Sequence, residues 1–114
     1  MLKNKLVLCI GNNTTHTDTL ATKYAEMHGS TNYGLINSVD ADINEVGFYH
    51  SSFADFDDVT NFLTLIQNFE HVIFFKQPKE TYDDITAYNL TKHAVELTKH
   101  RLQIPVEEID AEKT

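Results

Sequence analysis

Near its start the chain reads Lys5-Leu6-Val7-Leu8-Cys9-Ile10-Gly11, a continuous apolar run that ends in glycine. A run that is apolar on both alternating faces is typical of a strand buried in a parallel sheet. A second such run, from His71 to Lys76, ends at Gln77-Pro78. Because strands buried on both faces need helices above and below them, the sequence predicts an α/β protein.

Helical patterns separate these strands. The first begins at Thr17 or Asp18, either of which can cap a helix, and stops at Gly29. The second follows three aspartates, Asp55, Asp57 and Asp58, and carries one apolar stripe. The third begins at Asp83-Asp84 and reaches about Arg101. Residues 32–37 form a shorter strand, and residues 47–50 form either a fourth short strand or an ordered loop.

This alternation predicts a three-layer α/β fold. We expect a small, mostly parallel sheet of three or four strands with helices on both faces, a reduced Rossmann or flavodoxin-like arrangement. A strand order of 2-1-3 places the first strand at the centre, between residues 32–37 and residues 71–76. Residues 1–105 form this single domain, and residues 106–114 form an acidic C-terminal tail that frays from Glu107.

Charge and cysteine content exclude several partners. The chain has 114 residues with 9 Lys and Arg against 17 Asp and Glu, a net charge of −8. This balance disfavours nucleic acid and anionic membrane surfaces, because both are bound through basic residues. No apolar run approaches the ~20 residues of a membrane span. Cys9 is the only cysteine, which excludes an intrachain disulfide and indicates a cytoplasmic protein.

The loop after the first strand is the best candidate for a ligand site. A loop that leads into a helix offers unpaired N–H groups and the positive end of the helix dipole, which suit a phosphate or carboxylate. It also lies where a crevice opens between the first and third strands. The alternative is an ordinary polar connection with a helix cap. The expected ligand-binding residues are Gly11, Asn12, Asn13, Thr14 and Thr15, joined by Lys76 and Gln77 from the third strand.

Known motifs do not fit this loop. A Walker loop needs a second glycine followed by Lys and Ser or Thr, and a dinucleotide fingerprint needs three spaced glycines, but only Gly11 is present. A cysteine phosphatase needs an arginine shortly after Cys9, and none is there. A likeness to the Gly-Asp-Ser start of one esterase superfamily fails because the loop lacks the serine. We expect Cys9 to be a small buried hydrophobe.

Two histidines are candidates for proton transfer. His16 lies in the candidate loop, and His50 lies among aromatic, hydroxyl and carboxylate side chains in residues 47–56. Two other readings of this segment stay open. Phe53 and Phe56 can pack as a hydrophobic staple, or Phe48, Tyr49 and Phe53 can form an oligomer contact.

We predict no metal site and can name no cofactor. The set His93, Glu96 and His100 shares one helical face, which at first suggests zinc. That face carries lysines on both sides, and its spacing is that of solvated i,i+4 pairs.

Three stretches, residues 8–14, 47–52 and 75–78, resemble small uncharacterised proteins from marine phage and environmental sequences. The resemblance implies no known activity, but it singles out the segments that the fold brings to one edge of the sheet. We therefore expect binding of a small anionic or phosphorylated metabolite at the loop after the first strand. The alternative is a non-catalytic accessory protein that acts through a protein partner, or through self-association by residues 48–56. Whether the protein is an enzyme stays open.

Overall fold

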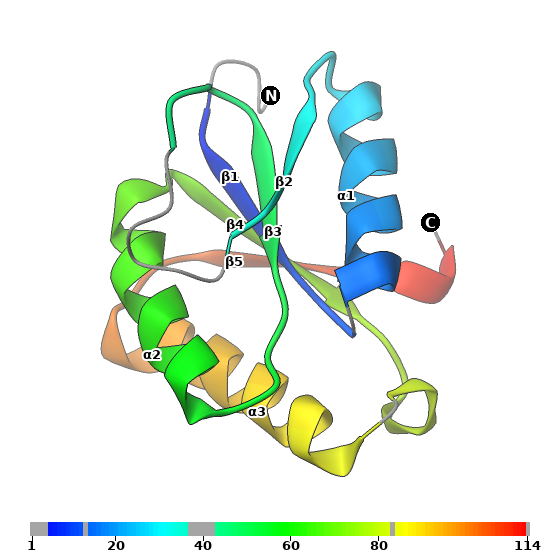
Figure 1. The fold of residues 1–114 in the computed structure, drawn as a ribbon, viewed down its shortest axis with the longest axis vertical. Coiled ribbons are helices and arrows are strands. Elements are labelled where there is room, and N and C mark those ends of the chain that lie inside the picture. Colours follow the sequence, from blue (N-terminus) through cyan, green and yellow to red (C-terminus); the bar gives the residue numbers. More distant parts are fainter. Residues whose placement is uncertain (1–4, 13, 37–42, 83, 114) are drawn as a thin grey trace.

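The computed structural model describes residues 5–12, 14–36, 43–82 and 84–113. Its five strands form one parallel sheet in the order β2-β3-β1-β4-β5, with helices on both faces (Figure 1). This confirms the predicted three-layer α/β fold, with five strands instead of three or four. In chain order the main elements are β1 (Val7–Ile10), α1 (Thr14–Met27), β2 (Asn32–Leu35), β3 (Phe48–Ser51), α2 (Phe56–Leu65), β4 (His71–Lys76), α3 (Ile85–Glu96) and β5 (Val106–Asp110).

The two apolar runs form the centre of the sheet. All four residues of β1 are fully buried, and alternate side chains pack against opposite helical layers. Val7 and Cys9 join the core under α1, whereas Leu8 and Ile10 join the core under α2 and α3. In Figure 1, α1 lies on one side of the sheet and α2 and α3 lie on the other. None of the described helices is long and apolar enough to cross a membrane.

Residues 48–51 form strand β3, which settles the alternative that the sequence left open. β3 pairs with β1 on one side and with β2 on the other. The predicted adjacency of β1 and β4 is confirmed, but the predicted adjacency of β1 and β2 is wrong. The reason is that His50 and Ser51, which are polar in the sequence, are both buried and complete a fully buried strand.

The expectation that the acidic tail frays is wrong for residues 106–110. These residues form β5 and pair with β4 from Val72↔Val106 to Lys76↔Asp110. Glu107 and Glu108 are accommodated in this edge strand because side chains from distant segments donate to their carboxylates or form ion pairs with them. Glu107 lies 2.7 Å from the His71 ring and accepts a hydrogen bond of 3.0 Å from the Tyr24 hydroxyl.

The helix ends follow local capping chemistry in part. Asp55 caps α2 by accepting from the Asp58 N–H at 3.1 Å, and Asp84 caps α3 by accepting from the Thr86 N–H at 2.7 Å. Asp83 lies outside the described residues. Gly29, at a φ of 67°, ends α1 as expected. However, α1 begins at Thr14, so neither Thr17 nor Asp18 is its cap.

Candidate functional site

The connections from neighbouring strands diverge at the carboxyl end of β1. The chain leaves β1 toward α1 on one face, and it leaves β3 and β4 toward α2 and α3 on the other. Such a change of direction between adjacent strands is where open α/β sheets bind ligands. The segments after β1, β3 and β4 therefore define the edge at which a site is expected.

Asn12 links two of these segments instead of lining an open pocket. Its side chain is buried, and its Nδ2 donates a hydrogen bond of 2.8 Å to the Thr81 carbonyl. Its backbone N–H donates to Gln77 Oε1 at 3.0 Å. These bonds hold the loop after β1 against the segment that follows β4. Asn12 therefore has a structural role, and its role in ligand binding stays a prediction.

Gly11 is a glycine because α1 approaches it closely. A Cβ atom built on Gly11 would lie 2.8 Å from Thr17 Oγ1 and 3.5 Å from Phe75 Cβ. The Thr17 side chain is fully buried, which explains why it packs against the loop and does not cap the helix. Thr14 and Thr15 form the first turn of α1; their side chains, like Asn13 as a whole, lie outside the described part of the chain.

Gln77 connects the loop to His16. The Gln77 Nε2 group donates to His16 Nδ1 at 2.8 Å, while its Oε1 accepts from Asn12. The structure therefore brings together three predicted site residues, Asn12, His16 and Gln77. Lys76 does not join them, because β4 alternation directs it to the opposite face, where it lies 3.8 Å from Glu108.

His50 is buried under α1. Its side chain is 2 % exposed, and its Nε2 lies 3.1 Å from Asp18 Oδ1. Burial lowers the pKa of His50, and the nearby Asp18 carboxylate only partly opposes this. The neutral ring therefore donates from Nε2 to Asp18, while Nδ1 is buried without a partner among the described residues. This arrangement ties β3 to α1, and proton transfer by His50 stays a prediction.

The lowered pKa of His50 makes the stability of the protein sensitive to pH. The unfolded chain binds the proton first as the pH falls below about 6.5, so acidification favours unfolding. We expect the free energy of unfolding of the wild type to fall between about pH 7.5 and about pH 5.5. We expect it to fall less steeply in His50→Gln, and the two slopes should differ by at most about 1.4 kcal/mol per pH unit, the value for one proton. Urea denaturation at several pH values measures the two slopes. Equal slopes in both proteins would show that His50 does not carry this dependence.

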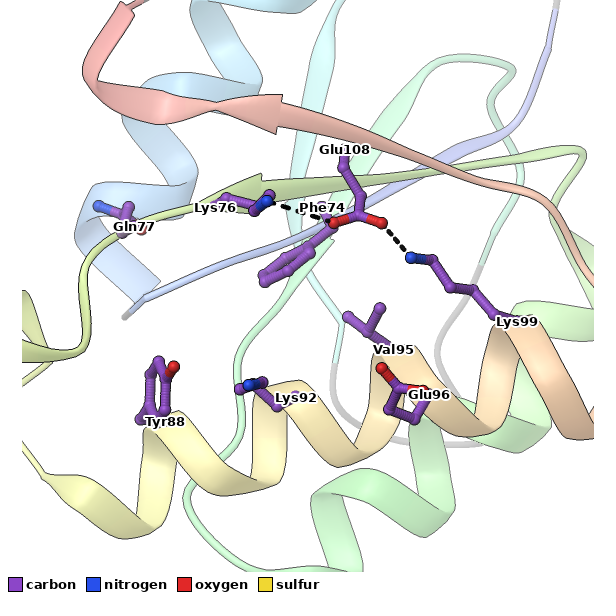
Figure 2. Close-up of a pocket in the computed structure, with 9 residues that line it drawn as sticks. All are labelled: Phe74, Lys76, Gln77, Tyr88, Lys92, Val95, Glu96, Lys99 and Glu108. Atoms are coloured by element: carbon purple, nitrogen blue, oxygen red, sulfur yellow. Dashed lines mark hydrogen bonds and ion pairs between the residues drawn. The ribbon is translucent and has the colours of Figure 1, made fainter.

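A pocket of about 260 Å³ opens on the other face of the same edge, between β4, β5 and α3 (Figure 2). We call it the lysine pocket because Lys76, Lys92 and Lys99 all line it. Phe74, Tyr88 and Val95 form its apolar walls. The remaining lining residues are Gln77, Glu96 and Glu108.

The charges in the lysine pocket differ from those of the whole protein. Three lysines and two glutamates line it, which gives one net positive charge in a chain of net charge −8. Lys99 bonds Glu108, and this contact lowers the pKa of the Glu108 carboxyl. Lys92 lies over the Tyr88 ring at 5.5 Å and forms no ion pair with any described residue. Lys92 is therefore a cation that a bound anion can reach.

Sequence reasoning missed Tyr88, Lys92, Lys99 and Glu108 as pocket residues. The helical pattern assigned Lys92 and Lys99 to a solvated face, and the spacing Tyr88, Lys92, Glu96, Lys99 was the signal available. That face becomes one wall of a pocket only because β5 lies opposite it. Glu96 also pairs with His100 at 3.0 Å, as an i,i+4 surface pair.

The aromatic segment 48–56 is mostly core. Phe48, Tyr49 and Phe53 are buried, and Phe53 packs edge-on against Phe62 at 5.3 Å. The expected staple of Phe53 with Phe56 is wrong, because Phe56 is 70 % exposed. Phe56 is thus the aromatic ring that this segment offers for contact with another molecule.

Comparison of the chain with models of known protein families, with curated proteins and with solved structures finds no match.

Proposed function

We propose that the protein binds a small anionic compound, such as a phosphorylated or carboxylated metabolite, in the lysine pocket. The observation that carries this proposal is the convergence of Lys76, Lys92 and Lys99 on one cavity of a strongly acidic chain. Lys92 lines this pocket over the Tyr88 ring and has no ion-pair partner among the described residues.

The shape and lining of the pocket favour a particular size of ligand. Lysine ammonium groups each offer three donors to a phosphate or carboxylate. Phe74, Tyr88 and Val95 would contact the apolar part of the same molecule. The volume of about 260 Å³ lies just below the roughly 300 Å³ at which typical ligand pockets begin. This size suits a single-ring or short-chain metabolite better than a dinucleotide.

The loop after β1 is connected to the lysine pocket through Gln77. Gln77 lines the pocket while it accepts from Asn12 and donates to His16. In this proposal Lys76 and Gln77 contact the ligand, as the sequence predicted. Asn12 acts by holding Gln77 in position, because its backbone N–H donates to Gln77 Oε1.

The test is the affinity of Lys92→Met for phenyl phosphate, measured by titration calorimetry. Loss of one charge-assisted hydrogen bond is expected to weaken binding about tenfold, equivalent to ~1.4 kcal/mol. Lys23→Met is the matched control, because Lys23 is exposed on α1 and its replacement changes the net charge equally. We expect this control to bind like the wild type. Equal weakening in both variants, or no binding by the wild type of phenyl phosphate, benzoate or inorganic phosphate, would contradict the proposal.

A cytoplasmic location is also part of this proposal. Cys9 is fully buried in β1, and burial raises the pKa of its thiol, so it serves as a core residue and not as a reactive group. The high net negative charge supports the absence of a nucleic-acid partner. Self-association through residues 48–56 stays a prediction. Sedimentation of a variant changed at Phe56, compared with the wild type, tests it.

A further inference from the structure

Glu108 occupies a distinctive place in the lysine pocket. It comes from the edge strand β5, and its carboxylate lies between two lysines of different elements (Figure 2). Glu108 Oε1 lies 3.8 Å from Lys76 Nζ, and Oε2 bonds Lys99 Nζ. Two ammonium groups therefore converge on one carboxylate at the wall of the cavity, which is the arrangement that an external oxyanion would require.

The other carboxylate of the pocket does not share this position. Glu96 pairs with His100 at 3.0 Å. Lys92 has no ion-pair partner among the described residues and lies over the Tyr88 ring. One part of the pocket thus holds an internal anion, and another part holds an unmatched cation. Removing the charge of Glu108 would raise the net charge of the lining from one positive charge to two.

We propose, resting on the proposed function, that Glu108 is an internal competitor that every ligand must displace, and that the ligand able to do so is a phosphate monoester. The anionic group of the ligand takes the place of the Glu108 carboxylate on Lys99 and is also held by Lys76 and Lys92. A phosphate monoester carries a charge of about −1.5 to −2 near pH 7 and has three acceptor oxygens, whereas a carboxylate carries −1. Displacing Glu108 costs every ligand the same free energy, so measurable binding needs the stronger anion, and the pocket binds a small phosphate monoester better than the matching carboxylate.

The aromatic wall narrows the ligand further. Phe74 on β4 and Tyr88 on α3 both line the pocket, one from the sheet and the other from the helix (Figure 2). A planar apolar group on the phosphate ester would pack against these rings. The class of ligand that meets both requirements is a phosphate monoester of a single-ring compound.

The experiment compares Glu108→Gln with the wild type for two probes, phenyl phosphate and benzoate, by titration calorimetry. We expect Glu108→Gln to bind each probe about fivefold tighter, the size of one partly exposed ion pair, and phenyl phosphate to stay the tighter ligand. Glu107→Gln is the matched control. It removes the same charge from the adjacent residue, which contacts His71 and Tyr24 away from the pocket, and it should bind both probes like the wild type.

The two titrations separate failure of the competitor role of Glu108 from failure of the proposed function. If the wild type binds phenyl phosphate but Glu108→Gln gains no affinity for benzoate, or loses it, Glu108 serves only to position the lysines and the competitor role is wrong. If neither protein binds either probe, the proposed function itself fails. Circular dichroism establishes that each variant is folded before titration, and Glu108→Ala provides a second variant with the same expected gain.

Discussion

A chain that stops after Pro105 is expected to lose its folded state. The truncation removes β5, whose five residues pair with β4 from Val72 to Lys76. Each backbone hydrogen bond contributes about 1 kcal/mol, and a small domain is stable by only about 5–15 kcal/mol. The cut also removes Glu107, which holds Tyr24 and His71, and Ile109, which packs against the core under α1. Together these losses are of the same size as the whole stability.

Circular dichroism and thermal unfolding measure this effect. A control chain that stops after Asp110 keeps all of β5 and should unfold cooperatively, near the temperature of the full-length protein. If the chain that stops after Pro105 also unfolds at that temperature, residues 106–110 do not belong to the sheet in solution, and Glu108 does not form a wall of the lysine pocket.

Phe75→Ala is expected to lower the free energy of unfolding by about 3–5 kcal/mol. Phe75 is fully buried on the face of β4 that packs under α1. Its ring lies 6.2 Å from the ring of Tyr24 in an edge-on contact, and its Cβ lies beside Gly11. The cavity left by the substitution lies among close-packed elements that cannot easily collapse into it, so the cost is near the upper part of the range for core residues.

Phe56→Ala is the matched control for Phe75→Ala. The same side chain is removed, but Phe56 is 70 % exposed at the start of α2, so the change should be within about 0.5 kcal/mol. Urea denaturation followed by circular dichroism measures both variants. A loss of several kcal/mol in Phe56→Ala would mean that its ring is buried in solution, as in a self-associated form. A small loss in Phe75→Ala would contradict the packing of β4 against α1.

The parts of the fold that local chemistry determines could be predicted from the sequence. An apolar pattern predicts the strands Val7–Ile10 and His71–Lys76, because every residue between their ends is apolar. Asp55 likewise predicts the start of a helix. β3 and β5 could not be predicted in this way. The polar residues of β3 are buried by distant contacts, and the glutamates of β5 are stabilised by Tyr24, His71, Lys76 and Lys99.

Some residues of the candidate site could be predicted from the sequence, and others could not. Lys76 and Gln77 could be placed at the carboxyl edge because they directly follow a buried strand. The structural role of Asn12 could not be predicted, because its amide donates to Thr81, 69 residues along the chain. Lys92 and Lys99 looked like parts of a solvated helix face. They line a pocket only because β5, which the sequence suggested was a tail, lies across from them.

Ligand binding in the lysine pocket is tested by a titration of the nitrogen-15-labelled protein with phenyl phosphate, followed by two-dimensional NMR. We expect saturable shifts concentrated at the backbone amides of Lys76, Tyr88, Lys92 and Lys99, all of which line the lysine pocket. Shifts centred on Asn12, His16 and His50 would place the ligand at the loop after β1 and would contradict binding in the lysine pocket, as would the absence of any saturable shift.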